Sequence, residues 1–352
     1  MGDRPRVGCV GRFGHQWPKV GFAKPDKPTR TGASRRGRRQ GIITELRIGC
    51  HAPLFPVDGS DGHTFLSQLT TMMTAVESRF DSVWFDDHLR PWADFVPPDT
   101  DNLECLTTIS YLAPSYPEFY FGCSVLCQSF RNPSLVAKMA ANLQFLTGGR
   151  FILGLGAGWM EPEYSAYGYP FPDAPVRISQ LREAVQVVRA LWSDVPATFE
   201  GRYYRVSEAI CRPLPDPVPP ILIGGGGERL TLRVVAEHAD WWNFTGMPET
   251  YAHKLDVLRE HCRAVGRDYD EIVKTYSAEF VAIAETEQAA RRIAAESPYT
   301  DVYPIVGDPE QVAAALRPLV EHGVSHLILR FVDFPSPAGA ELFADAVTPL
   351  LH

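Results

Sequence analysis

Eight short apolar runs, separated by amphipathic segments, are the feature that most restricts how this chain can fold. Runs of this length between turn residues are typical of buried strands, and parallel strands need a crossover helix between them. Their alternation over residues 42–352 predicts an α/β chain folded as a (β/α)8 TIM barrel with insertions, better than an open doubly wound sheet. The runs cover residues 46–50, 82–85, 119–125, 151–155, 220–224, 240–244, 275–282 and 326–331.

The segments between the runs carry helical patterns. Leu66, Leu69, Met73 and Val76 recur every three or four residues, as on one face of a helix. Asn132-Pro133 supplies a cap and a first-turn proline, which predicts a helix over residues 135–146 that stops at two glycines. Further helices are expected over residues 176–192, 228–237 and 311–320.

The N-terminal segment differs from the rest in charge. Residues 1–41 hold 11 Lys and Arg against 2 Asp, a net charge of +9, whereas the whole chain carries −8. We expect 1–41 to be a disordered basic segment and 42–352 to be the barrel domain. The remaining charge of −17 argues against nucleic-acid partners, because phosphate binding needs an excess of Lys and Arg.

Cysteine spacing and hydropathy indicate the cellular environment expected for the chain. The seven cysteines are widely spaced and include no Cys-x-x-Cys, which argues against a disulfide framework and a zinc ribbon. No apolar run is long enough to cross a bilayer, so no membrane partner is expected. We therefore expect a cytoplasmic protein.

Polar and glycine residues follow the strand-like runs. In a TIM barrel the active site forms at the carboxyl ends of the strands. Turns favour the same residue types, so each position alone also fits an ordinary turn, whereas together they indicate a site. They are His51, Asp86-Asp87-His88, Ser124 with Gln128, Gly156-Ala157-Gly158, Gly224-Gly225-Gly226-Gly227, Asn243, and Arg330 with Asp333.

Two glycine clusters call for different interpretations. Gly156-Ala157-Gly158 continues into Trp159 and a loop rich in Tyr and Pro, and a dinucleotide fingerprint would need a helix there. These glycines favour close approach of a flat ligand. The residues 224–227 precede an expected helix, so their amides predict a site for one phosphate; the alternative is a plain turn.

Asp87-His88 with Trp92 forms the third candidate. Asp87 offers a hydrogen-bond acceptor beside His88, an imidazole that titrates near neutral pH, and Trp92 offers a rigid aromatic wall for a binding site. No HExxH or clustered carboxylate pattern is present, so no metal is expected. No Gly-x-Ser-x-Gly elbow suggests covalent catalysis either.

These residues together resemble the luciferase-like flavin and deazaflavin oxidoreductases. The likeness covers residues 46–331 and is strongest for the branch that uses coenzyme F420, a phosphate-bearing 5-deazaflavin with an anionic oligoglutamate tail. The motifs that carry it lie at residues 122–126, 131–133, 151–159, 198–204, 220–229 and 239–243.

The resemblance implies roles for individual positions. By this resemblance Asp87 contacts the deazaflavin, His88 is the proton acceptor and Trp92 lines the reaction face. The resemblance also implies a non-prolyl cis peptide between Ser124 and Val125, behind the central ring of the deazaflavin. It also implies a homodimer. At Trp159 the family's sugar-phosphate dehydrogenases carry an acidic residue, so this chain departs from them and a sugar-phosphate substrate is doubtful.

The function expected from this resemblance is hydride transfer between coenzyme F420 and a small organic substrate. His88 would exchange the proton, with Trp92 and Glu161 as further catalytic candidates and His51 as another acid/base or cofactor contact. Phe55, Trp159, Asn243 and Arg330 would line the substrate pocket.

Two alternatives remain open at this point. A monooxygenase using reduced FMN would share the fold and consume oxygen. A non-catalytic binder of flavin or deazaflavin would bind the cofactor without turning it over.

Overall fold

The computed structural model describes residues 46–299 and 304–351, and the expected disordered segment 1–41 lies outside them. Each of the eight expected strand regions contains a barrel strand, although the run at 119–125 breaks before its end. Their bounds are β1 Arg47–His51, β2 Ser82–Phe85, β3 Tyr120–Cys123, β5 Phe151–Gly156, β8 Ile221–Gly224, β9 Trp241–Phe244, β10 Val273–Ile283 and β12 Val324–Phe331.

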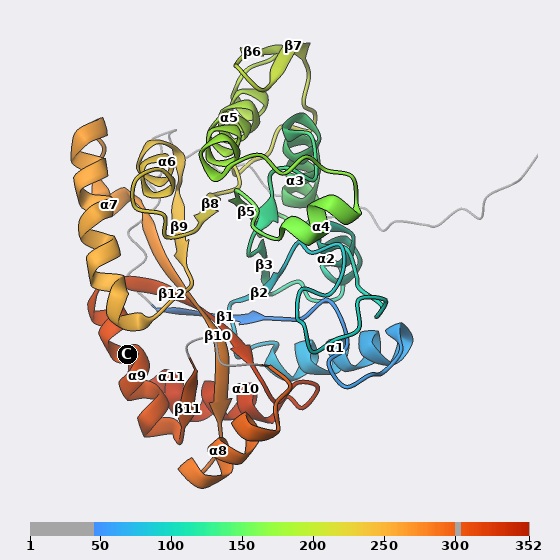
Figure 1. The fold of residues 1–352 in the computed structure, drawn as a ribbon, viewed down its shortest axis with the longest axis vertical. Helices are drawn as coiled ribbons and strands as arrows, with labels where there is room; N and C mark the ends of the chain where they lie inside the picture. Colours follow the sequence, from blue (N-terminus) through green and yellow to red (C-terminus); the bar gives the residue numbers. More distant parts are fainter. Residues whose placement is uncertain (1–45, 300–303, 352) are drawn as a thin grey trace, which may run out of the picture. The chain divides into compact units, whose positions relative to one another are not determined.

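These strands close into a parallel barrel. Their order is β10-β12-β1-β2-β3-β5-β8-β9, and a further pairing of β9 with β10 completes the circle. The first and last barrel strands, β1 and β12, therefore lie side by side (Figure 1), with Arg47 opposite His326. The TIM barrel is confirmed, and all its strands end at the same mouth.

Large indole rings fill the barrel interior. Trp84 of β2 and Trp241 of β9 are buried there with Ile152, Leu222 and Ile328. Glycines on the neighbouring strands make room, because a Cβ at Gly122 would lie 2.3 Å from the Trp84 ring. The barrel interior is thus a packed core.

Helices surround the barrel (Figure 1) and bury one face each. In α1 the buried stripe includes Phe65 and Leu69, whereas Leu66 of the expected stripe is only half-buried. The helices are α1 Gly62–Val76, α2 Cys105–Leu112, α3 Pro133–Leu146, α4 Glu161–Ala166, α5 Ala174–Ser193, α6 Thr231–His238, α7 Tyr251–Val265, α8 Glu287–Glu296, α9 Pro309–Glu321, α10 Ala338–Leu342 and α11 Thr348–Leu351. Short turns of helix lie at Pro248–Thr250 and Tyr269–Glu271, and a π-helix covers Phe343–Val347.

Three features depart from the sequence expectation. The run at 119–125 is not one strand, because it breaks at a cis peptide between Ser124 and Val125 and resumes as β4 Leu126–Cys127. An antiparallel hairpin of β6 Ala197–Glu200 and β7 Arg205–Ala209 is inserted before β8, and β11 Ile305–Gly307 pairs with β10.

No helix among the described residues combines the length and apolarity that crossing a membrane requires.

Candidate active site

A cavity of about 150 Å³ lies at the carboxyl ends of β2, β3 and β5. Typical sites for drug-sized ligands measure roughly 300–1,000 Å³. The enclosed part is therefore smaller than a complete cofactor site. It is lined by Asp86, Asp87, His88, Ser124, Val125, Cys127, Phe130, Gly156, Gly158, Trp159, Met160, Glu163 and Tyr164.

Ser124 and Val125 form one wall of this cavity. The expected cis peptide joins them, and glycines receive the Val125 side chain from two strands. A Cβ at Gly156 would lie 2.5 Å from Val125, and one at Gly224 would lie 2.9 Å away. The glycines at the ends of β5 and β8 are thus required by packing, which brings the backbone close to the cavity.

Gly158 continues the same wall. Its φ is +77°, in the left-handed region, and a Cβ there would lie 1.9 Å from the Tyr164 hydroxyl. Ala157 packs against the main apolar core instead. Of the three expected cofactor contacts in this segment, the two glycines line the cavity and Ala157 supports them from behind.

His88 is held by a carboxylate that the sequence interpretation missed. Glu163 of α4 is 1 % exposed, and its Oε2 lies 3.1 Å from His88 Nδ1. The other oxygen accepts from the Leu89 amide at 2.7 Å, so the carboxylate is fixed. Burial disfavours a charged imidazole, but the Glu163 hydrogen bond and the nearby Asp86 and Glu163 charges outweigh it, so the His88 pKa is raised.

Glu161 does not take part in this arrangement, which corrects its expected catalytic role. It is exposed on the first turn of α4. Successive helical residues turn by about 100°, so Glu163 points nearly opposite to Glu161. The helical period alone could have separated these two glutamates, because only one of them can face the barrel.

Trp92 and Trp159 lie beside His88. The Trp159 ring is 5.7 Å from the imidazole and nearly perpendicular to it, and the Trp92 ring is 6.5 Å away. Trp159 is 64 % exposed and covers the cavity from the solvent side. Phe55 lies behind Trp92 in an apolar cluster, so it supports the wall and does not form its surface.

Asp87 has a different neighbourhood from the one expected. Arg131 pairs with both of its oxygens at 2.7 Å, and the Cys127 amide donates to it at 2.8 Å. The carboxylate lines the cavity, and these donors occupy three of its roughly four acceptor sites. Asp87 therefore joins β2, β4 and the start of α3, and it also lines the cavity in which a cofactor contact was expected.

Four charged side chains from adjacent strands meet at the barrel mouth, and we call them the strand-end tetrad: His51, Asp86, Glu279 and Arg330. His51 bridges the carboxylates, with Nε2 3.1 Å from Asp86 and Nδ1 3.2 Å from Glu279. Arg330 donates to the same two carboxylates at 2.9 Å.

Electrostatics hold the tetrad in its charged form. Burial and Arg330 both oppose a charged His51, but Glu279 and Asp86 outweigh them and raise the His51 pKa to about 9. Burial favours neutral carboxyls, yet His51 and Arg330 lower the pKa of Asp86 and bring that of Glu279 to about 2. His51 and Arg330, expected as cofactor and pocket contacts, are instead almost wholly buried within the tetrad.

The glycine loop after β8 differs from the expected helix start. The helix α6 begins at Thr231, three residues later than expected, so residues 225–230 form an open loop. In the described part of the chain the amides of Gly226 and Gly227 have no hydrogen-bond acceptor. Lys254 of α7 approaches this loop and pairs with Glu228 at 2.6 Å, which places a cation beside the free amides.

Asn243 is not available to a ligand, which corrects its expected pocket role. Its side chain lies 4 % exposed inside the barrel. Its amide nitrogen donates to Ser277 at 3.0 Å, and its oxygen accepts from Thr275 at 2.7 Å. Asn243 therefore joins β9 to β10.

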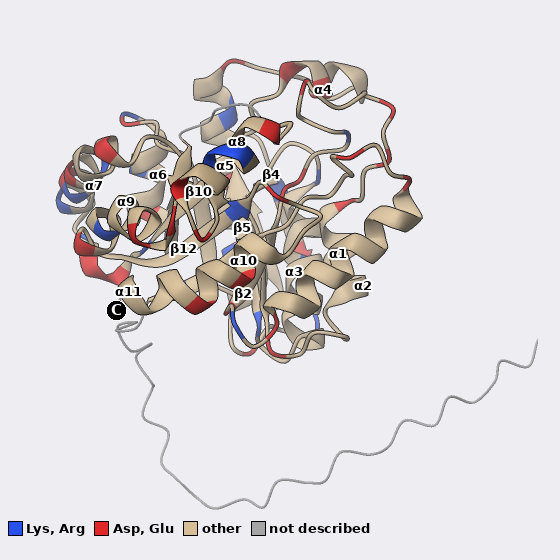
Figure 2. Cartoon of the chain, turned by 90° about the horizontal axis from the view of Figure 1, so that it is seen from below, with Lys and Arg blue, Asp and Glu red and all other residues tan. Residues whose placement is uncertain are grey.

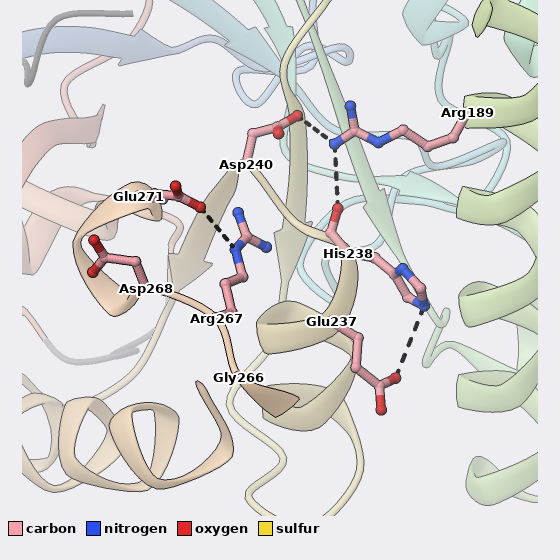
Figure 3. A pocket seen from close by; sticks show the side chains of 8 residues that line it. All are labelled: Arg189, Glu237, His238, Asp240, Gly266, Arg267, Asp268 and Glu271. Atoms are coloured by element: carbon pink, nitrogen blue, oxygen red, sulfur yellow. Dashed lines mark hydrogen bonds and ion pairs between the residues drawn. The ribbon is translucent and has the colours of Figure 1, made fainter. Parts of the chain in front are cut away.

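A larger, open hollow of about 660 Å³ lies at the amino ends of β9 and β10 (Figure 3). Figure 3 shows Arg189 reaching Asp240 and the His238 carbonyl, at 2.6 and 3.3 Å, and Arg267 facing Glu271. Its charged groups largely pair with one another. This end of a TIM barrel serves stability, so the mouth remains the candidate site.

Comparison with known proteins agrees with this geometry. The sequence profile described as luciferase-like monooxygenase matches residues 54–304. The chain belongs to the luciferase-like family. The match spans the candidate cavity and the glycine loop, and it confirms the resemblance inferred from the sequence.

Several members of the family are similar in detail. The chain is 30 % identical to the F420-dependent glucose-6-phosphate dehydrogenase of Kineococcus radiotolerans over 79 % of its own length and 90 % of that protein. It is 30 % identical to the F420-dependent hydroxymycolic acid dehydrogenase of Mycobacterium tuberculosis over 62 % of this chain and 59 % of the other. A structure of an F420-dependent secondary alcohol dehydrogenase with an F420–acetone adduct superimposes with a TM-score of 0.73 at 22 % identity, covering 88 % and 99 %, which shows the shared fold.

Proposed function

We propose that this chain is an oxidoreductase that transfers a hydride between coenzyme F420 and a small organic substrate. The observation that carries the proposal is that one cavity combines a glycine-backed backbone wall with an imidazole fixed by a buried carboxylate. The F420-dependent dehydrogenases among its relatives support the choice of cofactor.

The residues present fit a phosphate-bearing deazaflavin. Val125, Gly156 and Gly158 supply a wall that a flat ring can approach, because no side chain projects from the two glycines. The free amides of Gly226 and Gly227, with Lys254 beside them, suit a phosphate. Gly224 touches Val125 and leads directly into this loop, so the ring wall and phosphate loop are continuous.

The chemistry at His88 follows from its hydrogen bond. A bound deazaflavin would supply a carbon that accepts or donates a hydride. Because Glu163 accepts from Nδ1, the other ring nitrogen of His88 is the one that can take a proton from a substrate hydroxyl, or return it. Trp92 and Trp159 would exclude water from that exchange. The direction of hydride transfer stays open.

The alternatives make different predictions about oxygen. A monooxygenase with reduced FMN consumes oxygen, whereas a 5-deazaflavin oxidoreductase does not. The test is to add oxidised F420 and small alcohols to the protein, and reduced F420 and ketones, while recording cofactor absorbance and dissolved oxygen. We expect absorbance to change without oxygen uptake; oxygen uptake with reduced FMN would support the monooxygenase, and binding without turnover the non-catalytic binder.

We also infer a homodimer formed through the first three helices. In Figure 2 helices α1, α2 and α3 are almost free of charged residues, and their sequences contain Lys138 alone among Lys, Arg, Asp and Glu. On α3 Leu135, Phe145 and Leu146 are more than half exposed. An apolar, charge-poor surface of this kind favours self-association.

The proposal places the protein in a reducing cytoplasm. The six described cysteines are all free and buried, which fits that environment.

A further inference from the structure

Asp86 is the member of the strand-end tetrad that reaches the candidate cavity. It follows β2 directly and lines the cavity together with His88. Its side chain is 14 % exposed, whereas the side chains of His51 and Arg330 are 1 % and 2 % exposed. The tetrad therefore meets the proposed site through the Asp86 carboxylate.

Two basic side chains from other barrel strands hold this carboxylate. Asp86 Oδ1 lies 3.1 Å from His51 Nε2 on β1, and Asp86 Oδ2 accepts from Arg330 on β12 at 2.9 Å. Burial works against a charged Asp86, but His51 and Arg330 outweigh it and keep the Asp86 pKa well below its usual range. Asp86 is thus a fixed, ionised acceptor, and such an acceptor makes stronger hydrogen bonds than a neutral one.

Trp92 uses Asp86 as its hydrogen-bond acceptor. The indole nitrogen donates to Asp86 Oδ2 at 3.2 Å. Phe55 packs edge-on against the indole with the ring centres 6.1 Å apart, and the Arg330 guanidinium lies 5.4 Å from the indole ring centre. Packing alone restrains the second side-chain torsion of a Trp weakly, because that torsion has broad, roughly two-fold wells. The hydrogen bond to Asp86 therefore selects which edge of the indole faces the tetrad.

The orientation of Trp92 affects the space beside His88. The two ring centres lie 6.5 Å apart, and the ring planes are inclined by 46°. A substrate hydroxyl that is hydrogen-bonded to the imidazole lies about 3 Å from it, so the carbon atoms of the substrate can contact the indole as well. Misplacement of a reacting group by about 1 Å can lower turnover about 100-fold. Turnover at His88 should therefore depend on the group that fixes Trp92.

We propose that Asp86 is a positioning residue of the active site, which fixes the Trp92 indole beside His88 and thereby places the substrate at the imidazole. His51 and Arg330 contribute by holding the Asp86 carboxylate in place. Asp86 itself exchanges no proton with the substrate, because it acts through Trp92. This inference rests on the proposed F420-dependent activity.

The first test uses the full chain without cofactor, so its outcome does not depend on the proposed activity. The indole N–H signal of Trp92 is identified in a proton–nitrogen NMR spectrum by its loss in Trp92→Phe. Asp86→Ala removes the acceptor, so the indole proton should exchange with water at least about tenfold faster, and Asp86→Asn should restore part of the protection. Equal exchange in the wild type and Asp86→Ala overturns the inference.

Glu279→Gln is the matched control for this measurement. Glu279 also pairs with His51 and Arg330, so the variant removes one negative charge from the same tetrad but leaves the acceptor of Trp92 in place. Exchange of the Trp92 indole proton should change less than about threefold. A change as large as that in Asp86→Ala would show that the charge of the tetrad, and not the Asp86 hydrogen bond, protects the indole.

The second test is a double-mutant cycle on the F420-loaded enzyme, after the F420 dissociation constant of each variant has been measured. Values of kcat/KM are compared where they no longer depend on pH, because loss of the Asp86 charge also lowers the His88 pKa. Asp86→Ala and Trp92→Phe should each lower kcat/KM at least about tenfold, and the double variant should lie within about threefold of Trp92→Phe. A double variant that shows the product of the two losses contradicts the proposal.

Trp159 supplies the control cycle, because its ring lies 5.7 Å from His88 and its described ring contact is with the imidazole. The losses in Asp86→Ala and Trp159→Phe should multiply. If Asp86→Ala does not fold, Trp92→Phe decides, since it leaves the tetrad intact, and wild-type kcat/KM in that variant would refute the positioning role. F420 binding without turnover of any alcohol or ketone counts against the proposed function, and the indole exchange then decides the inference by itself.

Discussion

At the scale of single residues, the chemistry at the barrel mouth depends on which carboxylate each hydrogen-bond donor contacts. His88, which the sequence analysis placed just after β2, lines the candidate cavity, and Trp92 lies beside the His88 ring. No partners were predicted from the sequence for these two side chains, which contact Glu163 and Asp86 respectively. The helical period could have separated Glu163 from Glu161, whereas the contact between Asp86 and Trp92 depends on side-chain direction at a strand end, which the sequence does not specify.

The Glu163 carboxylate is predicted to position His88. In Glu163→Gln the neutral amide holds the imidazole less strongly, so kcat should fall about tenfold or more and the pKa seen in the kcat/KM profile should decrease. Glu161→Gln is the matched control and should retain wild-type kinetics. A larger loss in Glu161→Gln than in Glu163→Gln would reverse the assignment.

The strand-end tetrad is predicted to make the folded chain less stable at alkaline pH. The His51 pKa is about 9 in the folded chain and near 6.5 when unfolded, so the stabilisation is complete below about pH 6.5 and is lost as pH rises through 9. The free energy of unfolding is measured in urea at pH 6.5 and at pH 9.5. Between these two pH values it should fall by more than about 1 kcal/mol further in the wild type than in His51→Gln. If the free energy of unfolding changes equally with pH in the two proteins, His51 is not the group responsible.

At the scale of secondary-structure elements, the eight barrel strands and the helices α1, α3, α5, α6 and α9 could be predicted because their signals are local. Asn132 caps α3 and Asp308 forms a capping box at α9, as residue types at those positions suggest. The break between β3 and β4 is not visible in hydropathy, because Val125 continues the apolar run. Its position depends instead on contacts of Val125 with glycines on β5 and β8, far along the chain.

Gly156→Ala is predicted to damage cofactor binding more than folding. The added Cβ would lie 2.5 Å from Val125 and push that wall toward the cavity, so the dissociation constant for F420 should rise at least about tenfold. Gly266→Ala serves as the control. Gly266 has φ +72° with open space around it, so this change should cost about 1 kcal/mol of stability and leave F420 affinity unchanged. Wild-type affinity in Gly156→Ala would argue against this wall as the cofactor's platform.

At the scale of the whole molecule, the alternation of eight strands with helices was sufficient to predict the barrel, and the candidate cavity lies at the end of the barrel where a site was expected. It could not predict the hairpin of β6 and β7 or the strand β11, because these short elements pair outside the repeating pattern. The tetrad was also not predictable as a unit. Its members are up to 279 positions apart, and only barrel closure brings β12 beside β1.

Self-association should depend on the apolar surface of α3. Leu146 is 73 % exposed, and Leu146→Glu places a charge there, so the dimer should dissociate into folded monomers at micromolar concentration. Sedimentation equilibrium checks this, with Met247→Glu as the control on a different exposed apolar side chain. A wild-type protein that sediments as a monomer would contradict the proposed dimer.

The central claim is that the barrel mouth is built for a 5-deazaflavin, with its phosphate on the loop after β8 and its ring against Val125. The most direct measurement is a titration of the purified protein with F420 and with FMN, followed by tryptophan fluorescence, since Trp159 lines the cavity and Trp92 lies beside His88. We predict quenching by F420 at micromolar concentration and binding of FMN at least about tenfold weaker. Tighter binding of FMN, or no quenching by either cofactor, would contradict the account.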